Sequence, residues 1–166
     1  MLTNSTIDNE DLHPLFCFGS NNPRQLMERL TLPDQKMEVW TQKYIKKARL
    51  LDHQRVFRGL SKRWGGGTAS VQCFKNSVVH GFVAFLSTKQ LEILDRREGV
   101  FMSPPKYIRT KKEVEIGREC ISSFLYVATS PVFFPPTEQY LQNVAETISI
   151  FWPESGIVCA NDIPVL

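Results

Sequence analysis

The chain has 166 residues, of which 42% are hydrophobic and 22% are charged, and its formal net charge is +3. This length is typical of one domain with a single sizeable core, and the composition is ordinary for a globular protein. The small net charge, with lysines and arginines scattered among acids, argues against a nucleic-acid partner. The longest apolar stretches, such as residues 78–86, fall short of the roughly 20 residues that a membrane span needs, so we expect no membrane partner.

The N-terminal segment has no basic start followed by an apolar block, so it does not look like a signal peptide. We expect residues 1–14 to form a flexible tail and residues 15–166 to form one domain in the cytoplasm. The cysteines have no paired spacing and the three histidines have no metal-ligand spacing, which predicts free thiols in a reducing compartment, no metal site and no cofactor. The four cysteines are Cys17, Cys73, Cys120 and Cys159.

Seven stretches are rich in β-branched, aromatic and alternating apolar residues, which predicts strands. They are residues 15–18, 44–51, 54–58, 68–74, 78–86, 107–116 and 119–128. Gly117 and Arg118 stand between the last two stretches, and this spacing predicts a hairpin with glycine at the first turn position.

Three helices are expected. Asn22 and Pro23 predict the cap and first residue of one helix, and Ser87 to Gln90 form a capping box for a second that Gly99 closes. A third follows Thr137, with apolar residues at helical spacing as far as Phe151. Many strands with few helices predict an α+β domain with a curled or closed sheet.

The loop after the first strand is the first candidate site. The apolar run stops at Gly19, and Ser20 and Asn21 precede the first helix. Glycine permits close approach of the backbone, and exposed N–H groups beside a helix start favour an anion. An ordinary tight loop is the alternative interpretation. The phosphate-binding signature G-x-x-x-x-G-K-[ST] is absent, which disfavours a nucleoside triphosphate.

Glu98 is the second candidate, because it falls at the C-terminal end of the second helix. The negative pole of the helix dipole disfavours a charged carboxylate there, which is one way to raise the carboxyl pKa toward the range of a useful base. A nearby cation, Arg96 or Arg97, would lower that pKa again. The alternative is a solvated terminal glutamate. Asp95 is the competing carboxylate, and we expect it to cap or to pair structurally. The glycines at 65–67 predict a turn or a close backbone approach.

The order of these segments resembles the γ-glutamylcyclotransferase family over residues 16–140. The resemblance is carried by FGSN at 18–21, RWGGGTASV at 63–71, VHGFVAFLSTKQLEILDRREGV at 79–100 and PPTEQY at 135–140. The central block is the most specific, because it joins a G-x-V strand, a Gln-Leu helix start and Leu-Asp-x-x-Glu-Gly-Val. YIR at 107–109 is similar to the segment with a tyrosine that follows this block in the family.

The resemblance implies a β-barrel of six or seven strands, flanked by a few helices, with an active-site cavity at one end. Family members release 5-oxoproline and a free amine or amino acid from γ-glutamyl compounds, and the substrate's own α-amine is the nucleophile. By this resemblance Glu98 is the catalytic acid/base. The implied substrate-binding residues are Phe18, Gly19, Ser20, Asn21, Tyr107 and Tyr140.

The sequence departs from the family pattern at several points. The loop tyrosine of the family is Phe18 here, Phe124 stands where some relatives have tyrosine, and the segment from Glu98 to Tyr107 is longer and contains Pro104 and Pro105. Substrate identity therefore stays open. The alternatives are a relative specific for γ-glutamyl amines or for glutathione, and a non-catalytic binding module on the same fold. A homodimer is left open as the oligomeric state.

Overall fold

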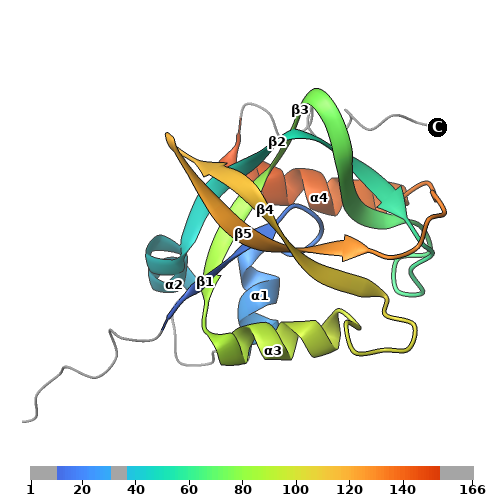
Figure 1. Cartoon of the computed structure of the whole chain (residues 1–166), viewed down its shortest axis with the longest axis horizontal. Helices are drawn as coiled ribbons and strands as arrows, with labels where there is room; N and C mark the ends of the chain where they lie inside the picture. The colour runs from blue at the N-terminus through green and yellow to red at the C-terminus, as the bar shows by residue number, and fades with distance from the viewer. Residues whose placement is uncertain (1–10, 31–36, 154–166) are drawn as a thin grey trace, which may run out of the picture.

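The computed structural model describes residues 11–30 and 37–153, which form five strands and four helices (Figure 1). In chain order these are β1 (His13–Cys17), α1 (Pro23–Arg29), α2 (Met37–Tyr44), β2 (Ile45–Arg58), β3 (Thr68–Leu86), α3 (Thr88–Arg97), β4 (Tyr107–Ile116), β5 (Glu119–Ala128) and α4 (Glu138–Phe151).

The strands close into a barrel in the order β1-β3-β2-β4-β5. Neighbours are antiparallel except where β1 meets β5, at the parallel pair Leu15 and Phe124. The hairpin between β4 and β5 has Ile116 opposite Glu119, and Gly117 takes the left-handed conformation with a φ of 60°, as predicted. The α+β class and the barrel are therefore confirmed.

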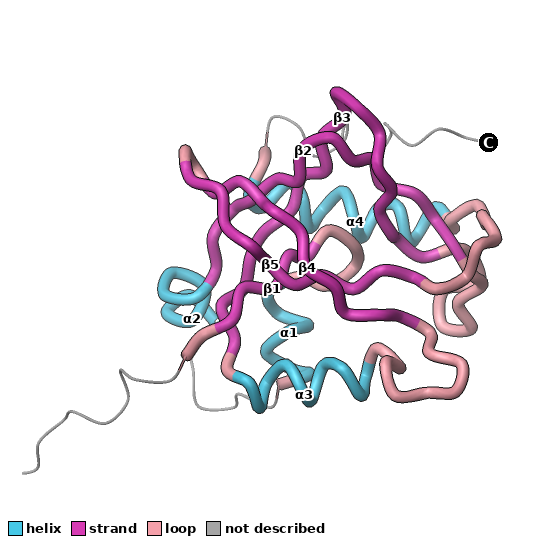
Figure 2. Tube along the Cα trace, viewed as in Figure 1, coloured by secondary structure: helices cyan, strands magenta, loops and turns pink. Residues whose placement is uncertain are grey.

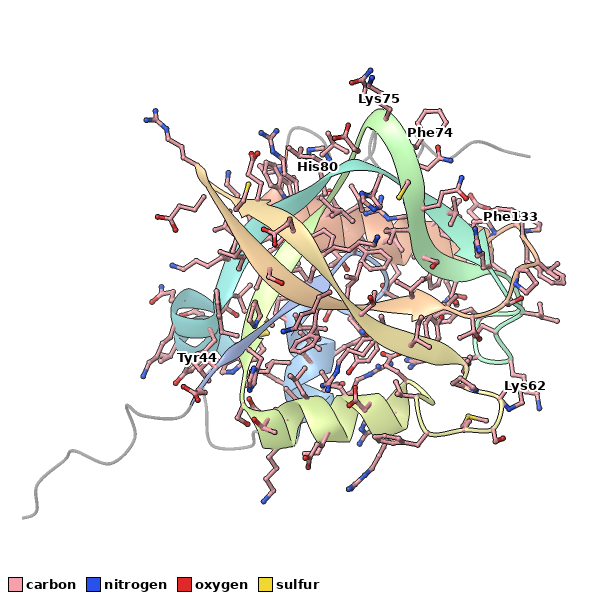
Figure 3. All side chains as sticks on the ribbon, in the orientation of Figure 1. Tyr44, Lys62, Phe74, Lys75, His80 and Phe133 are labelled. Atoms are coloured by element: carbon pink, nitrogen blue, oxygen red, sulfur yellow. The ribbon has the colours of Figure 1, made fainter. Side chains whose placement is uncertain are left out.

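The predicted count of six or seven strands is wrong, because β2 and β3 are each one long strand that the sequence divides in two. Each bends at a residue with positive φ, Asp52 at 56° and Asn76 at 68°. The Asn76 N–H donates to Asp52 Oδ1 at 2.9 Å, and the ladder register shifts between Leu51 and His53. Short polar segments interrupt the apolar pattern without ending the strands. Figure 3 shows Lys75 at the outer tip of the bend in β3.

The predicted helix caps are present. Asn22 Oδ1 accepts from the Gln25 N–H at 2.9 Å, Ser87 forms a capping box with Gln90, and the Thr137 side chain accepts from the first turn of α4. Helix α2 was not predicted. It buries only Trp40, so the sequence carries no apolar stripe that would indicate a helix.

Alternation along the strands divides the apolar residues between two packed clusters. Phe16 of β1 and Phe18, which follows the end of β1, join a cluster that includes residues of all five strands and of α4. Leu15 and Cys17 point the other way, toward a cluster with α1, α2 and α3. The period of two therefore uses both faces of β1.

Loops 59–67, 98–106 and 129–137 gather at one end of the barrel (Figure 2). The glycines at 65–67 explain how closely two of these loops approach. A Cβ on Gly67 would lie 2.1 Å from the Phe134 carbonyl oxygen, and Gly65 has a φ of 75°. Both expectations for these glycines, a turn and a close approach, are confirmed.

None of the helices within the described ranges is long and apolar enough to cross a membrane. Cys17, Cys73 and Cys120 are free, and Cys159 lies outside the described residues. Most of the predicted N-terminal tail also lies outside them, and β1 begins at His13.

Candidate active site

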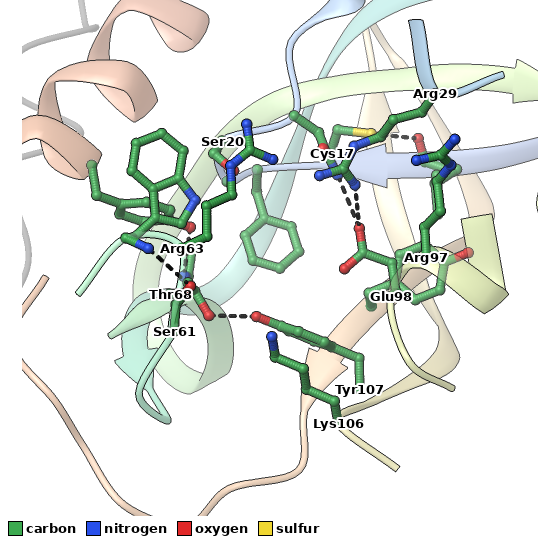
Figure 4. A pocket seen from close by; sticks show the side chains of 18 of the residues that line it. Cys17, Ser20, Arg29, Ser61, Arg63, Thr68, Arg97, Glu98, Lys106 and Tyr107 are labelled. Carbon is green, nitrogen blue, oxygen red and sulfur yellow. Dashed lines mark hydrogen bonds and ion pairs between the residues drawn. The ribbon is translucent and has the colours of Figure 1, made fainter. Parts of the chain in front are cut away.

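One cavity, of about 260 Å³, brings together every residue that the sequence singled out as catalytic or substrate-binding (Figure 4). Its lining includes Phe18, Gly19, Ser20, Asn21, Glu98, Tyr107 and Tyr140. These residues come from the β1–α1 loop, the end of α3, the start of β4 and the first turn of α4. The barrel thus assembles a single pocket from segments that are far apart in the sequence.

The loop at 19–21 presents backbone to this cavity. Within the described chain, the N–H groups of Gly19, Ser20 and Asn21 donate to no other residue, so they are available to a ligand. A Cβ on Gly19 would lie 3.3 Å from the Tyr140 hydroxyl, which leaves little room for a side chain. Helix α1 has only seven residues, so an anion at this loop would meet the loop N–H groups rather than a long helix dipole.

Arg55 of β2 fixes the start of this loop. Its guanidinium is buried, with the residue 5% exposed, and Nε donates to the Phe18 carbonyl at 2.9 Å. Nη2 donates to the His80 carbonyl at 2.9 Å, so one side chain ties β3 to the loop. A trans peptide points its C=O and N–H in opposite directions, and the Gly19 N–H therefore points away from Arg55.

Glu98 follows α3 as its C-terminal cap residue, and its side chain is only 15% exposed. Oε1 accepts from Arg29 Nη1 at 3.0 Å and from Asn21 Nδ2 at 3.3 Å. Oε2 accepts from no residue in the described part of the chain. The carboxylate is thus oriented through one oxygen and leaves the other for a ligand. The sequence suggested Arg96 and Arg97 as its cationic neighbours, but the ion pair is with Arg29 of α1.

Asp95 pairs structurally, as expected. The residue is 4% exposed, and its Oδ1 accepts from the Tyr126 hydroxyl of β5 at 2.8 Å. Its Oδ2 lies 3.2 Å from Arg109 Nη1 of β4. Burial is the largest cause that raises the pKa of Tyr126, and the hydrogen bond to Asp95 and its negative charge raise that pKa further. These contacts join α3 to two strands one turn before Glu98, so they determine where the carboxylate stands.

Two tyrosines form the opposite wall. The Tyr107 hydroxyl is hydrogen-bonded to the Thr68 hydroxyl, and the Tyr140 hydroxyl accepts from the Ala69 N–H at 2.8 Å. Burial raises the pKa of both phenols, so both are neutral near pH 7. Tyr140 also packs edge-on against Trp64 at 5.2 Å, which places Trp64 in the cavity wall as well as against the core.

Phe18 has no hydroxyl to offer. Phe18 is 6% exposed, and its ring stacks on the ring of Phe16 with the two ring centres 5.7 Å apart. Its polar contribution to the loop is the carbonyl that Arg55 holds.

Sequence reasoning missed the cations of the site. Arg29, Arg63 and Lys106 line the cavity, and Arg55 stands behind it. Isolated basic residues in helices, loops and strands are usually solvated surface, and nothing in the spacing of these four residues distinguishes them. In the described residues, no group of three or more His, Cys, Asp or Glu side chains could hold a metal ion.

No model of a known protein family matches the sequence, and no curated protein matches it. Solved structures do match. One named gamma-glutamyl cyclotransferase has a TM-score of 0.75 and 21% identity, covering 92% of this chain and 88% of the other. An uncharacterized Homo sapiens protein matches with a TM-score of 0.72 and 23% identity, covering 93% of this chain and 89% of the other. A yeast gamma-glutamyl cyclotransferase specific to glutathione matches with a TM-score of 0.51 and 12% identity, covering 94% of this chain and 90% of the other. The chain therefore has the γ-glutamyl cyclotransferase-like fold, as the sequence resemblance implied.

Proposed function

We propose that this protein is an enzyme of the γ-glutamylcyclotransferase type, which converts a γ-glutamyl compound into 5-oxoproline and a free amine or amino acid. One observation carries the proposal. The Glu98 carboxylate is mostly buried in a small cavity, held through Oε1, with Oε2 available to a ligand beside the loop of residues 19–21. The fold is shared with a structure named for this activity.

Glu98 acts as the acid/base. Near neutral pH the α-amine of the substrate is an ammonium, which cannot attack. Glu98 Oε2 takes one proton from it, and the freed lone pair then attacks the γ-carbonyl carbon of the same molecule. The attack forms the C–N bond that closes the five-membered ring and leaves two hydrogens and a positive charge on the ring nitrogen. The carboxyl proton passes to the departing nitrogen and the C–N bond to the leaving group breaks. The ring nitrogen then gives its surplus proton to Glu98 and through it to the released amine, which leaves as an ammonium. Proton transfer by a positioned group contributes about 10²–10⁴-fold in rate.

The loop of residues 19–21 binds the negative charges of the reaction. Its N–H groups would donate hydrogen bonds either to the substrate α-carboxylate or to the oxyanion that develops on the γ-carbonyl. Arg55 holds the preceding carbonyl, so the loop needs little rearrangement when the charge appears. Tyr107 and Tyr140 close the opposite wall and favour a folded substrate, in which the amine lies near the carbonyl that it attacks. Because the nucleophile belongs to the substrate, the proposal requires no cofactor.

The test is to incubate the purified protein with γ-glutamyl dipeptides, γ-glutamyl amines and glutathione, and to measure 5-oxoproline. Glu98→Gln keeps the size of the side chain and removes the base, so we expect turnover to fall by about 10²–10⁴-fold. Glu92→Gln is the matched control, since Glu92 is an exposed carboxylate on the same helix. It should keep wild-type activity.

Near-wild-type activity of Glu98→Gln would overturn the acid/base assignment. If no compound of the panel gives 5-oxoproline but calorimetry still detects binding, the chain is a binding module on this fold rather than an enzyme.

A further inference from the structure

The cavity has an unusual balance of charge. Glu98 is its one acidic lining residue among those described, against the four cations Arg29, Arg63, Arg97 and Lys106. A second hollow, of about 580 Å³, adjoins the cavity and shares Arg29, Arg63 and Arg97 with it. Its other lining residues are Gln25 and Glu28. The three arginines therefore stand where the two spaces meet.

Among the residues that the structure describes, Arg29 is the only one of these three arginines with an acidic partner. Arg29 pairs with Glu98 at 3.0 Å, whereas Arg97 and Lys106 pair with no carboxylate in the described ranges. The Arg63 guanidinium lies 5.4 Å from the centre of the Trp64 ring. Figure 4 shows Arg63, from the β2–β3 loop, across the cavity from Glu98, and Arg97, from α3, beside Glu98 on the side away from Arg63.

The leaving group must lie on the side of Glu98 where the cavity meets the second hollow. The same carboxyl that takes the ammonium proton also delivers it to the departing nitrogen, so the γ-glutamyl part fills the small cavity and the leaving part extends toward the second hollow. The γ-glutamyl ammonium balances Glu98, and its carboxylate uses one of the positive groups or the N–H groups of the loop. Arg63 and Arg97 remain for the leaving group.

We infer, on the basis of the proposed function, that the leaving group is an acidic amino acid, so that the preferred substrate is a γ-glutamyl dipeptide of the γ-glutamylglutamate type. Its departing residue carries two carboxylates, one for each of Arg63 and Arg97. Guanidinium groups bind carboxylates through paired hydrogen bonds, which gives geometric selectivity as well as charge. A leaving group that carries a cation, such as that of a γ-glutamyl diamine, meets like charge here.

The experiment compares kcat/KM for γ-glutamylglutamate and γ-glutamylglutamine, which differ in one charge and hardly in shape. We expect the wild type to prefer the acidic substrate by tenfold or more, and the preference to shrink as salt rises. Arg63→Gln or Arg97→Gln, whichever removes the partner of the side-chain carboxylate, should bring the ratio close to one, and the other should lower kcat/KM for both dipeptides. Lys62→Gln is the matched control, because Lys62 is exposed beside Arg63 and lines neither space. It should leave the ratio unchanged.

The inference and the proposed function fail in different ways. An equal or higher kcat/KM for γ-glutamylglutamine, or a ratio that survives both arginine substitutions, would overturn the inference and leave the cyclotransferase assignment intact. If neither dipeptide is turned over, the same pair is measured by calorimetry on Glu98→Gln. Selective binding of the acidic dipeptide would support the inference, and equal binding would overturn it.

Discussion

Arg55 is the residue whose role the sequence least suggested. It stands on a strand, between Gln54 and Val56, where a charged residue is normally taken to face solvent. Instead it is buried and donates to the carbonyls of Phe18 and His80. No substrate atom need touch it, so we regard it as a positioning residue, which acts through the peptide that joins Phe18 to Gly19.

Replacing this guanidinium should impair catalysis more than folding. Arg55→Lys keeps a positive charge but cannot place two donors in a fixed fork, and a hydrogen bond from a charged group contributes about 1.5–3 kcal/mol. We expect kcat/KM for 5-oxoproline formation to fall by roughly 10–100-fold, mostly in kcat, since one such bond corresponds to one or two powers of ten. Free guanidinium at millimolar concentration should partly restore the activity of Arg55→Ala.

Arg58→Lys is the control for this prediction. Arg58 lies on the same strand and donates to Gln72 at 3.1 Å, away from the cavity. A loss in Arg58→Lys equal to that in Arg55→Lys, or no rescue by guanidinium, would assign Arg55 to general stability only.

At the scale of elements, the contacts of Asp95 attach α3 to the barrel. Asp95→Asn keeps the acceptor for Tyr126 but removes the charge that Arg109 faces at 3.2 Å. Breaking a mostly buried pair leaves a charge without its partner, and we expect the free energy of unfolding to fall by about 1–3 kcal/mol. Urea denaturation measures this loss. Because Glu98 follows on the same helix, kcat/KM should also fall.

A double-mutant cycle separates the two partners of Asp95. Tyr126→Phe should lose about 1 kcal/mol, and its effect should nearly vanish when Asp95 is already Ala. Additive losses would mean that the hydrogen bond does not couple β5 to α3.

The elements show which features a sequence can predict. Local chemistry predicted the Ser87 capping box, the closure at Gly99 and the hairpin at Gly117, because each depends on a few neighbouring residues. The continuity of β2 and β3 was not predicted, because Asp52 and Asn76 look like the ends of strands in the sequence. In the structure the two strands stay paired on both sides of the bend at these residues. Helix α2 was missed because tertiary packing of Trp40, rather than a periodic stripe, holds it.

At the scale of the whole molecule, the site exists only because the barrel closes. Asn21 and Glu98 are 77 positions apart, and a hydrogen bond joins them. Periodicity and capping could not predict this contact, and only the resemblance of ordered motifs to a known family placed both residues in one pocket. Arg63 and Arg97 lie inside quoted motifs but were assigned no role in the site, and Arg29 belongs to no motif, so the convergence of the three became visible only in the folded chain.

The buried, neutral groups of the cavity predict how stability depends on pH. Burial raises the pKa of the Cys17 thiol, ordinarily 9.0, and the pKa values of Tyr107, Tyr126 and Tyr140, ordinarily 10.0. In the unfolded chain these groups lose their protons near the ordinary values, whereas in the folded chain they keep them. Stability from this source is therefore complete below about pH 9 and is lost as the pH rises further. Each group contributes a slope of up to about 1.4 kcal/mol per pH unit.

Urea unfolding between pH 7 and 10.5 tests this expectation. The wild-type free energy of unfolding should be insensitive to these groups up to pH 9 and then fall, first through Cys17 and above pH 10 also through the tyrosines. Cys17→Ala should lose stability at every pH through the cavity it leaves, yet fall less steeply between pH 9 and 10, because no thiol remains to ionise on unfolding. Cys73→Ala, at an exposed thiol, should keep the wild-type slope. Parallel curves for Cys17→Ala and the wild type would mean that the Cys17 thiol already ionises in the folded chain, and that this end of the cavity is open to water.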